Sequence, residues 1–436
     1  MDESVKARLC TVMGEVLARS HLVQPDEVAG DVRAALAPVG LGATVYLVDL
    51  PQRTLRALPA PGVATPDERD VDRSVPGRVF TMVTSAHDGP RDLWVPLFNG
   101  TERLGVVHFT LPPRADAGDD DWRRHCERIA GMVGHLVAAK TAHGDSLHRA
   151  RRSAPVSPAG ELVLQMVPEL TSSHRRLALS AITYPQDDPQ GVAYDYAVDG
   201  SVAHVALLHA AGTGLGAALR CAVVLSAVRA SRRAGGDLRA QATAADAALT
   251  EAFPQAEGSR CVAALLARLD LDTGLWCHVN ASHPQPLLLR GSRLVLPLVH
   301  GRRLPLGARA PEEVPAALLR FSGGSRDIAP TTFTEPSEEK LRPLDRILLH
   351  NGLVAADVGE ADPRLTVGRL VALTEECEEA GLPAPETLRR LTRAVAAHGG
   401  PHGAGGALLL EWSAEAARRT VPGHAEASPA AVAAAP

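Results

Sequence analysis

The sequence is poor in aromatic residues and cysteines, and it carries no large excess of charge. Phe, Trp and Tyr together make up 3% of its 436 residues, so aliphatic side chains must supply most of the core packing. The net charge of −5 excludes the basic surface that nucleic-acid binding requires. The six cysteines are scattered without a CxxC pair. They therefore predict reduced, packed thiols in a cytoplasmic protein rather than a disulfide framework.

Several motifs that define common protein classes are also missing. No apolar run approaches the ~18 residues of a membrane span, and the first residues lack the basic and apolar leader of a signal peptide. There is no Walker loop and no dinucleotide fingerprint. The turn Gly212-Thr213-Gly214 is not the nucleophile elbow of a serine hydrolase. We therefore expect no membrane span, no mononucleotide site and no nucleophilic triad.

What is present is an ordinary globular composition, with 45% hydrophobic and 22% charged residues. A chain of this length predicts two or three domains. Apolar residues at helical spacing predict a helix over residues 4–20. Strands are expected over residues 43–50, and residues 93–97 and 104–111 form a hairpin around Asn99-Gly100.

This N-terminal order of helix, strands, hairpin and long exit helix resembles a GAF sensor domain. Residues 94–97, Trp-Val-Pro-Leu, followed by Leu-Gly-Val-Val-His-Phe at 104–109, are typical of its central strands. The resemblance predicts an N-terminal helix over residues 1–22 and a GAF-like α/β sensor domain over residues 23–141. It implies a small ligand, which the sequence does not identify.

Residues 142–172 are interpreted as a helical connector. The stretch 143–157 is polar and basic, and residues 159–170 turn apolar again. Two interpretations stay open, a solvated linker or a helix that pairs with its twin and transmits a signal. The second predicts a homodimer.

The second domain is expected over residues 173–412. Three strands are expected between residues 177 and 209, followed by two helices over 215–253 and two β-hairpins over 261–298. Residues 308–342 are rich in Pro, Gly, Ser, Thr and Glu, which predicts a long mobile loop. A last strand at 407–412 closes the sheet. The Ala- and Pro-rich tail, residues 413–436, is expected to be disordered.

Three stretches carry a family resemblance across residues 160–412. Leu207 to Leu219 is an apolar strand, a glycine turn and a small-residue helix. Val279 to Arg290, Val-Asn-Ala-Ser-His-Pro-Gln-Pro-Leu-Leu-Leu-Arg, and the Leu-Pro-Leu-Gly at residue 304 follow in the expected order. Together they resemble the SpoIIE-like serine phosphatases of the metal-dependent, protein phosphatase 2C-like superfamily. The resemblance implies a β-sandwich flanked by helices, so the whole chain is expected to be α+β.

Active members of that family hydrolyse phosphoserine or phosphothreonine with two divalent cations, which need carboxylate ligands. The resemblance places those aspartates at four points of this chain. The first three are occupied by Val192, His209 and Asn351, and the late acidic pair is replaced by Gly405 and Gly406. All four carboxylate positions are therefore lost, and we expect no metal cofactor.

The vacated pocket is expected to be lined by seven residues: Tyr194, Asp195, His209, Gly212, Gly214, His350 and Asn351. Asp195 is interpreted as a structural partner of its turn, and His283 as a buried scaffold histidine. Gly212 and Gly214 shape a turn that has no room for a Cβ atom. One alternative is a zinc or iron centre at His209 and His350, joined by His398 or His402.

The leading hypothesis is a non-catalytic pseudophosphatase in partner switching or developmental regulation. Family analogy suggests an anti-sigma system or a similar regulator as the protein partner. One alternative is an enzyme with new chemistry in the vacated pocket. Another is a weak residual serine/threonine phosphatase.

Overall fold

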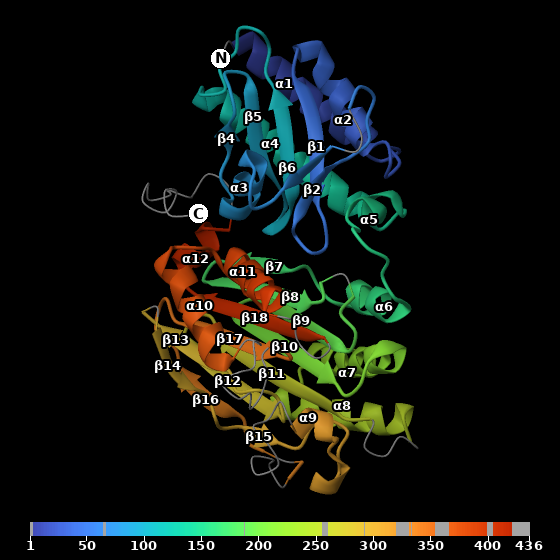
Figure 1. The fold of residues 1–436 in the computed structure, drawn as a ribbon, viewed down its shortest axis with the longest axis vertical. Coiled ribbons are helices and arrows are strands. Elements are labelled where there is room, and N and C mark those ends of the chain that lie inside the picture. Colours follow the sequence, from blue (N-terminus) through green and yellow to red (C-terminus); the bar gives the residue numbers. More distant parts are fainter. Residues whose placement is uncertain are drawn as a thin grey trace. The chain divides into compact units, whose positions relative to one another are not determined.

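The computed structural model describes residues 3–63, 67–186, 188–254, 260–291, 293–319, 331–332, 334–353, 366–398 and 404–420. Its contacts divide the chain into two compact units. The first contains residues 1–155 together with 418–436, and the second contains residues 156–417. Each unit has its own sheets and its own core (Figure 1).

The N-terminal unit is built on one antiparallel sheet with strand order β3-β2-β1-β6-β5-β4. The predicted hairpin is confirmed, because β5 pairs with β6 around the turn at Asn99-Gly100. The strands are β1 Gly42–Val48, β2 Thr54–Ala57, β3 Glu68–Asp70, β4 Ala86–His87, β5 Asp92–Asn99 and β6 Glu102–Thr110. The helices are α1 Glu3–Arg19, α2 Val28–Leu36, α3 Val75–Met82, α4 Asp120–Thr141 and α5 Ser146–Ala150.

The two faces of this sheet carry separate cores because side chains alternate along each strand. Val45 and Val95 face one way and join the main core with α1, α2 and α4. Tyr46 and Trp94 face the other way and pack with Phe80 of α3. The GAF-like assignment of this unit stays a prediction.

The C-terminal unit is a sandwich of two sheets, as predicted. One has the order β15-β12-β11-β10-β9, with β16 also paired to β12, and the other has the order β14-β13-β17-β18-β8-β7. Its strands are β7 Thr171–His174, β8 Leu177–Tyr184, β9 Val192–Asp199, β10 Val202–Ala210, β11 Val262–Asp270, β12 Leu275–Ala281, β13 Leu287–Arg290, β14 Arg293–Pro297, β15 Arg302–Arg303, β16 Ser337–Lys340, β17 Arg346–Asn351 and β18 Gly405–Trp412.

Helices cover both outer faces of the sandwich (Figure 1). Helices α6, α7 and α8 pack on the sheet that contains β10, whereas α10 and α11 pack on the sheet that contains β17. A third core fills the space between the sheets and includes Leu207, Leu349 and Leu408. The helices are α6 Pro158–Met166, α7 Gly214–Arg233, α8 Leu238–Ala252, α9 Ala316–Leu319, α10 Val367–Glu379, α11 Ala384–Ala397 and α12 Ala414–Arg418.

The connector, which was interpreted as helical, contains the short helix α5, in which Leu147 is buried. Two other segments are more ordered than the sequence suggested. The stretch predicted as a mobile loop contains α9 and also β16, which pairs with β12 through residues such as Glu338. The expected disordered tail begins with α12. Local composition missed these elements because tertiary packing and strand pairing stabilise them.

Helix α7 is, within the described ranges, the one helix long and apolar enough by composition to cross a membrane. It lies instead in the folded domain, where Cys221, Val224 and Val228 are buried against the sheet.

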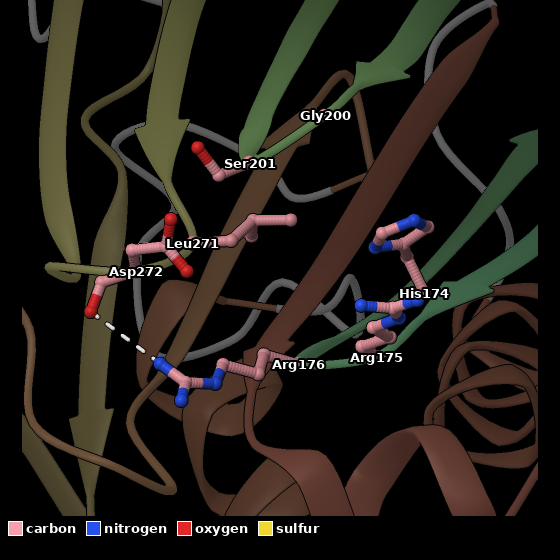
Figure 2. A pocket seen from close by; sticks show the side chains of 7 residues that line it. All are labelled: His174, Arg175, Arg176, Gly200, Ser201, Leu271 and Asp272. Carbon is pink, nitrogen blue, oxygen red and sulfur yellow. Dashed lines mark hydrogen bonds between the residues drawn. The ribbon is translucent and has the colours of Figure 1, made fainter.

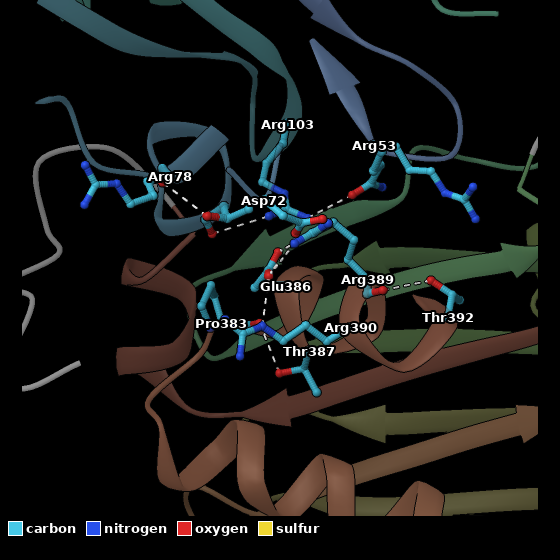
Figure 3. Close-up of polar contacts among 12 residues, drawn as sticks. Arg53, Asp72, Arg78, Arg103, Pro383, Glu386, Thr387, Arg389, Arg390 and Thr392 are labelled. Carbon is cyan, nitrogen blue, oxygen red and sulfur yellow. Dashed lines mark hydrogen bonds and ion pairs between the residues drawn. The ribbon is translucent and has the colours of Figure 1, made fainter. Parts of the chain in front are cut away.

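Helix α11 carries a buried carboxylate. Glu386 is 1% exposed and accepts hydrogen bonds from Arg389 at 2.8 and 2.9 Å and from Arg390 at 3.2 Å (Figure 3). These partners lie three and four residues further along the same helix, the spacing at which helical side chains meet.

Candidate functional site

The site begins at the end of β10, where the chain turns sharply into α7. Both Gly212 and Gly214 have positive φ values, +84° and +71°, a conformation that side chains with a Cβ atom rarely adopt. The expectation that this turn has no room for a Cβ atom is wrong: the nearest atom to a Cβ on Gly212 is Arg220 Nη2 at 3.9 Å, and nothing lies within 4 Å of one on Gly214. The positive φ values alone favour glycine at these two positions. The Gly214 N–H donates to Gln190 Oε1 at 3.1 Å, so a side-chain amide already occupies the first donor of the helix.

Four strands from the two sheets bring the expected ligand positions together. Val192 at the start of β9 is the register partner of His209 on β10, and Asn351 at the end of β17 is the partner of Gly406 on β18. The two pairs meet across the sandwich: a Cβ atom on Gly406 would lie 2.8 Å from Val192 Cγ1 and 3.5 Å from Asn351 Oδ1.

Gly405 and His350 do not join that cluster. Side chains alternate along strands, and Leu349 lies in the core between the sheets whereas Leu348 packs against the α10 and α11 layer. Asn351 therefore shares the inner face with Leu349, and His350 points to the outer one. By the same alternation Gly406 faces inward and Gly405 outward.

Asn351 is the polar centre of the cluster. It is fully buried, and its Nδ2 group lies 3.1 Å from His283 Nε2 and donates to the Leu208 carbonyl at 3.3 Å. Its side chain also bonds to His209. His283 is held in turn by Asn280, whose Oδ1 accepts the His283 N–H at 2.8 Å. Asn351 thus joins strands of both sheets.

The histidines in and beside this cluster stay neutral at neutral pH. Burial lowers the pKa of His209 and of His350 to about 4 each. Burial also lowers the pKa of His283 to about 3, and repulsion from His350 and His209 adds to the effect. Desolvation disfavours the charged form of each ring.

These residues are a poor match to a pair of hard dications. Mg²⁺ and Mn²⁺ take mainly carboxylate and carbonyl oxygens, and Val192, His209, Asn351 and Gly406 supply no carboxylate. Among the described residues, no group of three or more His, Cys, Asp or Glu side chains could hold a metal ion. His398 is exposed, and its Nδ1 lies 2.7 Å from the Ala394 carbonyl of its own helix. His402 lies outside the described residues.

Tyr194 and Asp195 were predicted to line the pocket, but their contacts lie elsewhere. The Tyr194 hydroxyl donates to the Pro168 carbonyl at 2.7 Å. Asp195 is 2% exposed and faces α7, where it is paired with Arg229 at 2.7 Å and Arg232 at 2.8 Å. Asp195 is structural, as expected, but its partner is the helix and not the turn.

Two sets of contacts were not predicted from the sequence. One is the pair of ion pairs that Asp195 makes with Arg229 and Arg232, called the Asp195 clamp below. The other is the contact between Asn351 and His283. The spacing of Asn280 and His283 is typical of a turn in which an asparagine side chain accepts a hydrogen bond from a backbone N–H a few residues later. Nothing in the local sequence points from Asn351 to His283, because sheet pairing alone brings them together.

Comparison with known proteins supports the family assignment. The family model described as stage II sporulation protein E (SpoIIE) matches residues 199–405. The match includes His209 on β10 and Asn351 on β17, whereas Val192 and Gly406 lie outside it. The matched residues all lie in the C-terminal unit, which is therefore SpoIIE-like. No curated protein matches the sequence.

Several solved structures resemble the chain. The RsbU and RsbW domains of Rv1364c from Mycobacterium tuberculosis are 19% identical over 57% of this chain and 63% of that one, with a TM-score of 0.40. The phosphatase domain and a regulatory-domain fragment of SpoIIE from Bacillus subtilis are 13% identical over 55% and 64%, with a TM-score of 0.40. The SiaA-PP2C domain of Pseudomonas aeruginosa is 17% identical over 54% and 86%, with a TM-score of 0.42. The matched region covers less than two thirds of the length of the Rv1364c and SpoIIE structures.

Proposed function

We propose that the SpoIIE-like domain is a pseudophosphatase that acts by binding a regulatory protein. The observation that carries the proposal is the meeting of Val192, His209, Asn351 and Gly406 at one point between the sheets. These are the positions at which the family resemblance expects metal-binding carboxylates. They converge as the fold requires, and none of them supplies a negative charge.

Electrostatics explain why such a site would not support two-metal hydrolysis. A pair of dications in a desolvated site needs nearby anions to offset its lost hydration. The residues at the four positions are uncharged, since burial keeps His209 neutral. Without bound cations there is no metal-activated water and no charge to neutralise the phosphoryl oxygens.

The partner we propose belongs to an anti-sigma system or a similar partner-switching pathway. The match of residues 199–405 to the SpoIIE family model supports this choice. In the same proposal the N-terminal unit is a GAF-like sensor that binds a small molecule, and the protein is a cytoplasmic homodimer.

The test is an assay of the full chain on p-nitrophenyl phosphate and on a phosphoserine peptide, each with Mn²⁺ or Mg²⁺. We expect no hydrolysis above the rate of a heat-denatured sample. An active SpoIIE-family phosphatase domain, assayed in parallel, controls for the buffer and the metal. Metal-dependent turnover at a rate comparable with that control, abolished by EDTA, would refute the proposal.

A further inference from the structure

A pocket of about 500 Å³ lies at the end of the C-terminal sandwich opposite to His209. Three hairpin turns form it, those that join β7 to β8, β9 to β10 and β11 to β12. His209 ends β10, whereas Ser201 comes just before β10 begins, so the length of the strand separates this pocket from the vacated metal site. Seven residues line it: His174, Arg175, Arg176, Gly200, Ser201, Leu271 and Asp272.

Three hydrogen bonds hold the pocket in shape. The Leu271 N–H donates to the Ser201 carbonyl at 2.7 Å, and the Leu271 carbonyl accepts from Trp412 Nε1 at 2.9 Å. Leu271 is 3% exposed and gives the pocket an apolar part. Arg176 Nη1 reaches the Asp272 carbonyl at 3.4 Å, which links the first and third turns (Figure 2).

The guanidinium groups of Arg175 and Arg176 have no carboxylate partner among the residues that the structure describes. Several other arginines of the unit are paired with carboxylates, for example Arg290 with Asp345 at 2.6 Å and Arg303 with Asp246 at 2.6 Å. The side chains of His174 and Arg175 make no hydrogen bond or ion pair with any residue that the structure describes. Both are exposed at the pocket (Figure 2).

This combination fits an anion joined to an apolar group. A guanidinium presents planar N–H donors that match phosphate oxygens, and charge-assisted bonds of this kind are stronger than neutral ones. Two arginines against the single carboxylate of Asp272 leave a net positive pocket, to which Ser201 adds a hydroxyl donor. The volume is that of a small-ligand site.

We propose that this pocket binds a phosphomonoester, with the phosphate at Arg175, Arg176 and His174 and the organic part against Leu271. The phosphate belongs either to a small molecule or to a phosphorylated side chain of a partner. This proposal does not depend on whether the SpoIIE-like domain binds metal, since the pocket shares no residue with the cluster of Val192, His209, Asn351 and Gly406.

The experiment is calorimetric titration of the full chain, in EDTA, with phenyl phosphate and separately with a short phosphoserine peptide. The variant is R175Q combined with R176Q. The control is R233Q, because Arg233 is an exposed arginine at the end of α7. We expect saturable binding of at least one probe, weakened about tenfold or more by the double variant and unchanged in R233Q. The tighter probe identifies the source of the phosphate.

Three results would overturn the proposal. The first is the absence of binding of both probes to the wild-type chain. The second is equal weakening in R233Q, which would indicate a general charge effect. The third is binding of benzoate as tight as that of phenyl phosphate, which would exclude selection for phosphate. Thermal unfolding of each variant checks that the exposed substitutions leave the fold intact.

Discussion

Gly406 lies so close to Val192 that a Cβ atom on the glycine would stand 2.8 Å from the valine Cγ1. Contacts below about 3 Å force neighbouring atoms to move, and overpacking a core costs about 1–3 kcal/mol. The branched side chain of Val192 therefore occupies the space that a side chain at position 406 would need.

The first prediction concerns this contact. G406A should lower the free energy of unfolding by about 1–3 kcal/mol, and V192A in the same chain should recover part of that loss because it removes the opposing methyl groups. Urea denaturation of both single variants and the double variant measures the coupling. G216A is the control, since the nearest atom to a Cβ there is Arg220 Nη1 at 3.8 Å. Strictly additive effects of G406A and V192A would contradict the packing.

The second prediction concerns pH. His209, His283 and His350 have pKa values lowered to about 4, 3 and 4 in the folded protein, against about 6.5 in the unfolded chain. Above pH 6.5 both states are neutral and the stability is complete. As the pH falls from 6.5 towards 4 the unfolded state takes up protons first, so each histidine removes up to about 1.4 kcal/mol per pH unit.

Urea denaturation at pH 7.5, 6.0 and 5.0 tests that expectation. H350Q should show a shallower loss of stability with falling pH than the wild-type chain, whatever its stability at pH 7.5. H398Q is the control because His398 is exposed. Parallel pH profiles for wild type and H350Q would contradict the assignment of a buried neutral imidazole at His350.

The third prediction concerns the Asp195 clamp between β9 and α7. D195N removes a buried charge that is paired with both Arg229 and Arg232, so it should cost about 3 kcal/mol of stability. Arg229 also donates to the Met166 carbonyl at 2.7 Å, so the end of α6 should become more accessible to protease. D199N, at the exposed end of the same strand, is the control. A loss equal to that of D199N would show that the clamp contributes little.

Much of this architecture is predictable because local pattern and tertiary structure agree. The run of apolar residues predicted β10, and the Asn-Gly turn predicted the hairpin of β5 and β6. The family motifs also located Val192, His209, Asn351 and Gly406, which the fold then brought to one point.

The sequence interpretation went wrong at His350, Asp195 and β16, each for a physical reason. His350 and Asn351 are neighbours in sequence, but side chains alternate along a strand, so the two point to opposite faces of the sheet. The sequence interpretation placed both in one pocket because it did not take this alternation into account. Asp195 was assigned to its turn, because the two arginines that pair with it lie more than thirty residues further along. Strand β16 was missed because its residues Ser-Glu-Glu-Lys have little apolar pattern and depend on the edge of β12.

The central claim is that the SpoIIE-like domain does not assemble the two-metal centre of its active relatives. The most direct measurement is a crystal of the full chain soaked in MnCl₂, with the anomalous difference density examined at Val192, His209, Asn351 and Gly406. We predict no manganese peak between these four residues. A pair of bridged manganese ions at that position would contradict the account.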